Sequence, residues 1–162
     1  WWCCIKKIIM FKDFDITKYY KKNPPPNGSF TTMQEIKELK KIPINRKFIK
    51  DKDNTLETFK KAGDKVGVDV PQGLIELGIK LPNVELDSMK TPSYPSGHST
   101  QAYLIAHVLG DIYPKYKDIF IKAANDISYS RNIARCHYRS DSKFGKLLGR
   151  EMYNHLKENY GV

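Results

Sequence analysis

The sequence has 162 residues, which suffices for one ordinary hydrophobic core and is short for two domains. Its composition, 40% hydrophobic and 28% charged, is typical of a soluble globular protein, and no apolar run approaches the roughly 18 residues that a membrane span needs. Lys and Arg outnumber Asp and Glu by 28 to 18, and the resulting net charge of +10 favours anionic partners without selecting one.

The cysteines indicate the redox environment. There are 3 of them, an odd number, and Cys3 and Cys4 are adjacent, which argues against a disulfide framework. We therefore expect reduced thiols and a soluble protein of the cytoplasm.

The first half of the chain has weak helical signals. Residues 1–28 form an N-terminal arm in which the prolines and glycine of KKNPPPNG forbid regular structure, and 29–162 is predicted to be one helical domain. A helix is expected from about Thr32, because Thr32 and Glu35 have the spacing of a capping box. A second helix is predicted over 54–67. A short helical stub at 74–80 and an extended loop at 81–95 follow.

The second half has stronger helical periodicity. Apolar residues predict a helix over 99–113, and Pro114 then opens the next helix, which reaches about Cys136. A break at 137–142 precedes a last helix over 142–159. Strand signals are sparse, so the sequence predicts an all-α, single-domain helical bundle.

The Pro114 turn has a geometric consequence. His98 lies sixteen residues before Pro114 and Arg131 lies seventeen residues after it. At about 1.5 Å per residue both legs of the hairpin are about 25 Å long, so His98 and Arg131 should meet at one end. His137 and Asp141 follow in the break before the last helix. Spacing alone therefore predicts that these four side chains surround one cavity.

These residue types suit chemistry on a phosphoryl group. Ser96 and Gly97 present unpaired N–H groups at a helix N-terminus, and Arg131 adds a planar fork of donors, which together form an oxyanion cradle. One imidazole can attack phosphorus while another protonates the leaving alkoxide, and Asp141 can orient His137. A metal site is disfavoured because Arg131 would repel a cation.

Each feature also has an ordinary interpretation. A PSG turn before a helix is commonly only an N-cap. Arg131 could be a salt-bridging helix residue, and Asp141 a first-turn acid that the helix dipole favours. His107 and His155 fit such structural roles.

Two motifs resemble a known family. PSGH at 95–98 and SRNIARCHYRSD at 130–141 are similar to the second and third signatures of the type 2 phosphatidic acid phosphatase/vanadium haloperoxidase superfamily. The third signature is Ser-Arg, five residues, His, three residues and Asp, and every position is filled. MKTPSYPSGHSTQ especially resembles the soluble acid phosphatases and their phage or bacterial relatives. The resemblance covers residues 85–160 and implies a helical bundle.

The resemblance also implies roles for the site residues. His137 would be the nucleophile that forms a phosphohistidine, with Asp141 as its orienting partner and His98 as the general acid. The phosphoryl oxygens would be bound by a set of polar groups, namely Ser96, Gly97, Arg131 and Lys90.

The first signature of the family, Lys, six residues and Arg-Pro, is absent. The nearest arrangement is Lys65 followed by Gln72 and Gly73, where both later positions differ, and this indicates a missing helix. Arg135 and Arg139 are, with Lys90, the candidates to replace the lost positive charge.

The sequence leaves several functions open. The leading prediction is a metal-independent phosphomonoester hydrolase of the acid phosphatase or phosphatidic acid phosphatase type, which acts on a phosphorylated small molecule or lipid. It would need no cofactor, although vanadate would mimic phosphate in the cradle. One alternative is a degenerate, catalytically weak relative that binds phosphate or a phosphorylated ligand, and another is a vanadium-dependent haloperoxidase.

Two expectations concern macromolecular partners. Nucleic acid is not expected, because the basic residues are scattered rather than striped with aromatic ones. A face exposed by the missing helix would favour a homo-oligomer.

Overall fold

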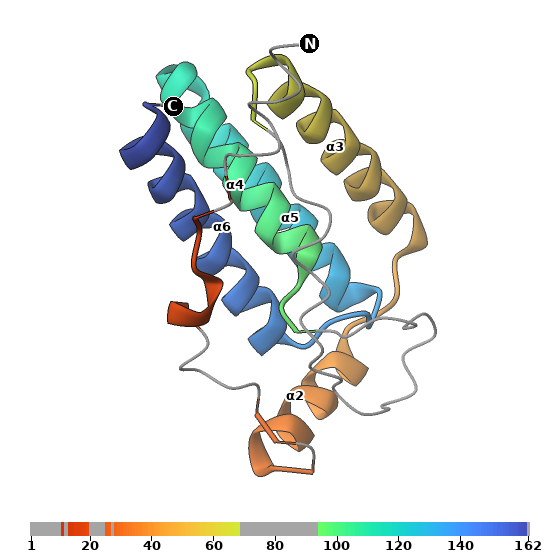
Figure 1. The fold of residues 1–162 in the computed structure, drawn as a ribbon. Helices are drawn as coiled ribbons and strands as arrows, with labels where there is room; N and C mark the ends of the chain where they lie inside the picture. Colours follow the sequence, from red (N-terminus) through yellow and green to blue (C-terminus); the bar gives the residue numbers. More distant parts are fainter. Residues whose placement is uncertain (1–10, 12, 20–24, 27, 69–93, 162) are drawn as a thin grey trace.

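Five α-helices and two short 3₁₀ helices make up the described part of the computed structural model, which covers residues 11, 13–19, 25–26, 28–68 and 94–161 (Figure 1). These residues contain no strand, which confirms the predicted all-α, single-domain bundle. None of their helices is long and apolar enough to cross a membrane. The elements in chain order are η1 (Ile16–Tyr19), α2 (Phe30–Lys41), α3 (Arg46–Lys65), α4 (Gly97–Ile112), η3 (Pro114–Tyr116), α5 (Lys117–Ile133) and α6 (Arg139–Tyr160).

The helix α4 is the centre of the bundle. It packs against α3, α5 and α6, and Figure 1 shows α3 and α6 on opposite sides of the α4–α5 pair. Apolar side chains cover most of its circumference, as a helix surrounded by neighbours requires. One buried cluster joins α3, α4 and α5 through Leu56, Phe59, Ala102, Ile105, Ala106, Leu109, Ala124 and Ile127. A second joins α4 and α6 through Leu104, Val108, Leu148, Met152, Tyr153 and Leu156, together with Val68.

Two glycines bring α6 unusually close to α4. A Cβ atom at Gly149 would lie 2.4 Å from the Thr100 carbonyl oxygen, and one at Gly145 would lie 2.6 Å from the Ser96 carbonyl oxygen. Real Cβ atoms do not approach backbone oxygens so closely, so these positions require glycine. The first half of α6 is thereby pressed against the turn that opens α4.

The helices α2 and α3 both begin earlier than the sequence predicted. The first helix begins at Phe30 because Ser29 is its N-cap and accepts a hydrogen bond from Thr32 N; the predicted start at Thr32 was wrong. The second begins at Arg46, eight residues before the predicted Asn54, because Asn45 caps it through Phe48 N. In both cases a polar residue outside the predicted helix caps its start.

The last two helices are joined by a short turn. α5 ends at Ile133 and α6 begins at Arg139, earlier than the predicted 142. Arg135 has a left-handed backbone, with φ of 55°, where the chain reverses. Asp141 therefore lies in the first turn of α6 rather than in the break, where it was predicted.

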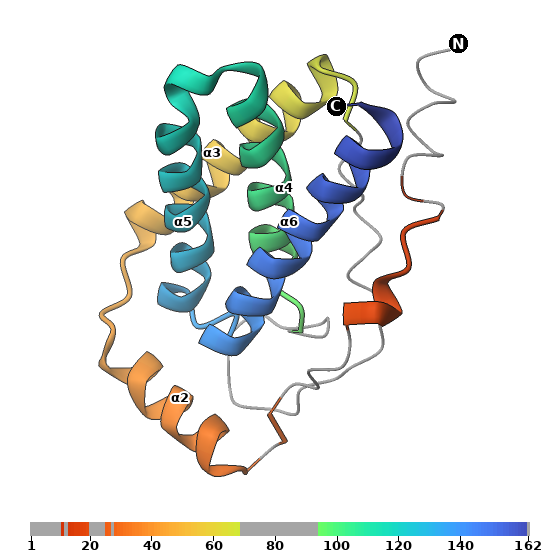
Figure 2. The same ribbon diagram turned by 90° about the vertical axis from the view of Figure 1, so that its left-hand side faces the viewer.

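The helix α2 and the N-terminal segment border the bundle. Figures 1 and 2 show α2 apart from the four packed helices, at the end where α3 begins. Its Glu35 carboxylate accepts hydrogen bonds from Ser140 N and Ser140 Oγ, both at 2.8 Å, at the start of α6. In the predicted arm, Phe11 and Phe14 pack against the α4–α6 cluster. The predicted stub at 74–80 and nearly all of the loop at 81–95 lie outside the described residues.

Candidate active site

The turn before α4 is fixed from three sides. Ser96 is fully buried and is the N-cap, accepting hydrogen bonds from Ser99 N at 3.4 Å and Ser99 Oγ at 3.0 Å. Ser99 Oγ also lies 2.8 Å from Ser128 Oγ on α5. On the other side, Ser96 N donates to the Asp141 carbonyl oxygen at 3.2 Å. The predicted cap is therefore present, and it links the starts of α4 and α6 to α5.

His98 and Arg131 meet as the hairpin spacing predicts. Arg131 NH1 lies 3.5 Å from His98 Nε2, although the residues are 33 positions apart. The guanidinium is buried, and its Nε donates to Ser130 Oγ at 3.1 Å. η3 turns the chain at Pro114, and α4 and α5, with 16 and 17 residues, are similar enough in length to return Arg131 to the N-terminus of α4. The convergence predicted for these two residues is confirmed.

His137 and Asp141 form a second pair at the same end of the bundle. His137 Nδ1 lies 3.7 Å from Asp141 Oδ2, and both side chains are buried. The same oxygen accepts a hydrogen bond from Tyr138 N at 2.9 Å, so the carboxylate also caps α6. Asn132 Nδ2 donates to the His137 carbonyl oxygen at 2.9 Å. The backbone of the nucleophile candidate is thus held by α5, and its ring faces a carboxylate on α6.

The helix α3 contributes two groups that the sequence analysis missed. Asp53 Oδ1 lies 2.6 Å from Arg131 NH2 and 3.9 Å from His98 Nε2. Lys60 is close enough to His98 to lower its pKa. The two are seven residues apart, with buried Leu56 between them, so they share the face of α3 that packs on the bundle. That spacing is the signal in the sequence that could have identified them.

The surroundings of His98 determine its charge. Burial, the Arg131 guanidinium, His137 and Lys60 together lower the pKa of His98 from 6.5 to about 3. Removal of water disfavours the cation, and the neighbouring positive groups repel it. In this environment His98 is a neutral imidazole at neutral pH, beside a cationic guanidinium.

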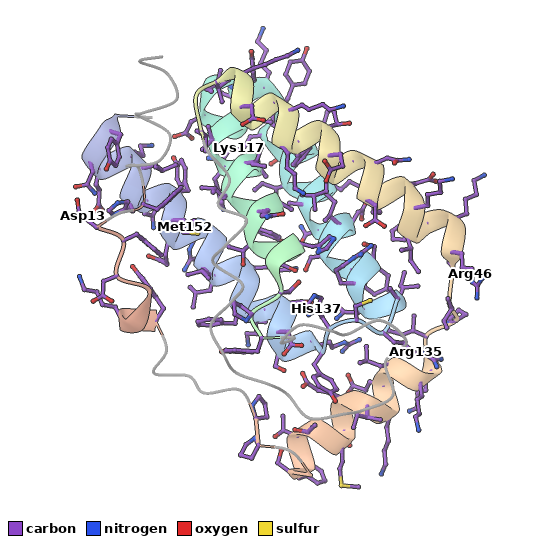
Figure 3. All side chains as sticks on the ribbon, turned by 45° about the vertical axis from the view of Figure 1, so that its right-hand side comes forward. Asp13, Arg46, Lys117, Arg135, His137 and Met152 are labelled. Atoms are coloured by element: carbon purple, nitrogen blue, oxygen red, sulfur yellow. The ribbon has the colours of Figure 1, made fainter. Side chains whose placement is uncertain are left out.

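Of the other predicted cations, Arg139 does not join this cluster. Arg139 is largely exposed and forms an ion pair with Glu38 of α2 at 2.9 Å. Arg135 lies in the turn before His137, and Figure 3 shows both at the end of the bundle opposite Lys117. Lys90 lies outside the described residues. Among the residues that are described, no three His, Cys, Asp or Glu side chains converge to form a metal site.

The described arrangement is suited to an oxyanion. The N-terminus of α4 and the Arg131 guanidinium supply positive charge, and two imidazoles stand beside them. The ammonium group of Lys60 is also near, although it forms an ion pair with Glu57 at 2.7 Å. Asp53 opposes this field, because its carboxylate contacts the guanidinium directly.

The sequence was compared with models of known protein families and matches none of them. No curated protein is significantly similar to it.

Proposed function

We propose that this chain is a metal-independent phosphomonoester hydrolase that acts through a phosphohistidine at His137. One observation carries the proposal: the His98–Arg131 contact at 3.5 Å and the His137–Asp141 pair at 3.7 Å share one end of the bundle, although three different helices and a turn supply the residues. Two imidazoles beside a buried guanidinium form the minimum set for nucleophilic phosphoryl transfer without a metal.

The proposed reaction has two balanced steps. The Asp141 carboxylate, 3.7 Å from Nδ1 of His137, would orient the ring so that the lone pair of Nε2 is free to attack phosphorus. The N–P bond forms as the P–O bond to the alcohol breaks, and His98 gives its proton to the departing oxygen. Water then attacks the phosphohistidine, His98 takes back a proton, and phosphate and His137 are released.

His98 must be protonated for the first step, whereas burial and the neighbouring positive groups lower its pKa to about 3. A bound phosphoryl group carries negative charge, which offsets the guanidinium of Arg131 and favours the imidazolium. The substrate would thus raise the pKa of its own general acid. Phosphate contacts from Arg131 and from the first-turn N–H groups of α4 would stabilise the charge that develops on the phosphoryl oxygens.

We also propose that the chain belongs to the phosphatidic acid phosphatase/haloperoxidase superfamily and that α3 is its altered first-signature helix. The family signature separates Lys from Arg by six residues, and six residues separate Asp53 from Lys60. Lys60 keeps one positive charge near His98, and Asp53 reverses the other. In this interpretation no helix is missing, and Lys65 is not part of the signature.

Hydrolysis of para-nitrophenyl phosphate by wild type and His137→Ala tests the catalytic role. We expect the substitution to reduce kcat at least 1000-fold, on the order of the loss seen when a nucleophile is removed. His107→Ala, which removes an imidazole outside this cluster, is the matched control and should retain activity. Equal activity in wild type and His137→Ala would reject the proposal, and acid-labile ³²P on wild type alone would support the phosphohistidine.

A second candidate function is suggested by Asp53. Its carboxylate lies 2.6 Å from the guanidinium that would bind the substrate, so the protein could bind phosphate or a phosphorylated ligand without turning it over. Calorimetry with phosphate or vanadate distinguishes the two functions: binding without hydrolysis supports the degenerate relative, and turnover excludes it.

A further inference from the structure

A groove runs along the bundle between α5 and α6. Both helices pack on α4. Figure 2 shows that α5 and α6 lie on either side of α4 and diverge from each other. The space between them has a volume of about 720 Å³. Tyr103 and His107 of α4 form its floor, with Ile121 of α5 and Leu147 of α6 on its walls. Of the candidate active-site residues that the structure describes, none lines this groove.

The floor of the groove is aromatic and uncharged. His107 stacks on Tyr153, with ring centroids 5.2 Å apart, and burial together with Lys117 and Arg150 lowers the pKa of His107. Tyr94 and Phe144 stack at one end, with ring centroids 4.8 Å apart. The groove is therefore lined by flat apolar surfaces on which a ring or an alkyl chain can pack.

Among the described residues that line the groove, every charged one is basic: Lys117, Lys143, Lys146 and Arg150. Lys117 and Arg150 have acidic neighbours in Asp111 and Glu151. Within the described part of the chain, neither Lys143 nor Lys146 has a carboxylate within 4.0 Å, and Lys146 instead donates to Asn125 Oδ1 at 2.9 Å. The Lys146 ammonium also lies 5.2 Å from the centre of the Tyr103 ring, and burial lowers its pKa. A partly buried cation without an acidic partner attracts an anion.

We propose that the α5–α6 groove binds a small amphiphilic anion, whose ring or acyl body packs on Tyr103 and Leu147 and whose carboxylate, sulfonate or phosphate head contacts Lys146 and Lys143. The volume is within the range of small-molecule sites, about 300–1000 Å³. Because the lining is mainly apolar, an inorganic anion alone should bind poorly. Because the charged lining residues are basic, a neutral molecule of the same shape should bind more weakly than an anionic one. This site is separate from the candidate active site and does not depend on the proposed hydrolysis.

The experiment is a fluorescence titration of the whole chain with 1-anilinonaphthalene-8-sulfonate, with N-phenyl-1-naphthylamine as the neutral probe of nearly the same shape. Saturable binding of one sulfonate probe per chain, at least ten-fold tighter than the neutral probe, is expected. Lys146→Met should weaken the binding of the sulfonate about ten-fold, as the loss of a charge-assisted contact does. Lys50→Met removes an exposed lysine of α3 and is the matched control, which should bind as wild type does.

Two competitors identify the chemistry of the ligand. Laurate should displace the probe, whereas inorganic phosphate at the same concentration should not. Equal binding of the two probes, equal affinity of Lys146→Met and Lys50→Met, or displacement by phosphate would overturn the proposal. Sedimentation velocity provides a further test: a dimer that excludes the probe and dissociates in Lys146→Met would assign the groove to a second copy of this chain instead.

Discussion

Asp53 is the residue whose removal should change the candidate active site most informatively. Its carboxylate contacts the Arg131 guanidinium at 2.6 Å and lies 3.9 Å from His98. A phosphoryl group that binds Arg131 must displace this carboxylate or share the guanidinium with it. Asp53→Asn keeps the shape of the side chain and removes the competing charge, so we expect it to strengthen anion binding.

The size of the effect follows from the geometry. A phosphoryl oxygen on Arg131 would lie about 4 Å from the Asp53 carboxylate, where the repulsion between two charges is about 1 kcal/mol in water and about 4 kcal/mol at an effective dielectric of 20. Arg131 is 8% exposed and Asp53 is 45% exposed, so solvent screens one side of the pair. We therefore expect a gain of about 1–3 kcal/mol, or about 5- to 150-fold in Kd.

Isothermal titration calorimetry with orthovanadate and with phosphate measures this gain. Asp51→Asn is the matched control, because it removes the same charge from an exposed position of the same helix. Both variants are compared at one salt concentration, and circular dichroism establishes that they remain folded. Equal affinities of Asp53→Asn and Asp51→Asn would refute the reasoning about Asp53, whereas absence of binding by every form would reject the phosphate site itself.

Three further predictions concern stability. Gly149→Ala should lower the free energy of unfolding in urea by about 1–3 kcal/mol, because the new methyl group meets the backbone of α4. In the control Gly110→Ala, the methyl group meets the flexible Lys117 side chain and should not destabilise the protein. Equal effects of the two substitutions would contradict the close approach of α4 and α6. Glu35→Ala should cost about 1 kcal/mol and accelerate hydrogen exchange in α2, because it removes both hydrogen bonds to Ser140; unchanged exchange would show that other contacts retain α2. The pKa of His98 is about 3 in the folded protein and 6.5 is its ordinary value, so below about pH 6.5 the unfolded chain binds a proton that the folded chain does not. His98→Gln should therefore lose less stability than wild type on acidification from pH 7 to pH 4. Parallel stability profiles of the two proteins would contradict this shift.

The hairpin was predictable because its signals are strong and local. Apolar residues recur regularly along α4 and α5, and Pro114 marks the turn, so residue counting sufficed to bring His98 and Arg131 together. The starts of α2 and α3 were not predictable in this way. Each begins at a polar cap, Ser29 or Asn45, which the apolar pattern does not mark.

Asp53 was missed for a different reason. The first signature of the family that the sequence resembles consists of positively charged residues, so an acidic residue gives no signal of it in the sequence. Only the packing of α3 on α4 and α5 shows that Asp53 faces Arg131 rather than solvent alone. The basic groove was also hidden, because Tyr103, Ile121 and Lys146 come from three helices whose divergence no local pattern encodes.

The matched lengths of α4 and α5 restrict how this protein can change during evolution. One residue inserted within α5 would turn everything after it by about 100° and move it about 1.5 Å along the axis. The guanidinium of Arg131 would then leave the side of the helix that meets His98. Lineages of this chain should therefore tolerate many exchanges of side chains in the hairpin but few changes in its residue count, with added or deleted residues confined to the tip around Pro114.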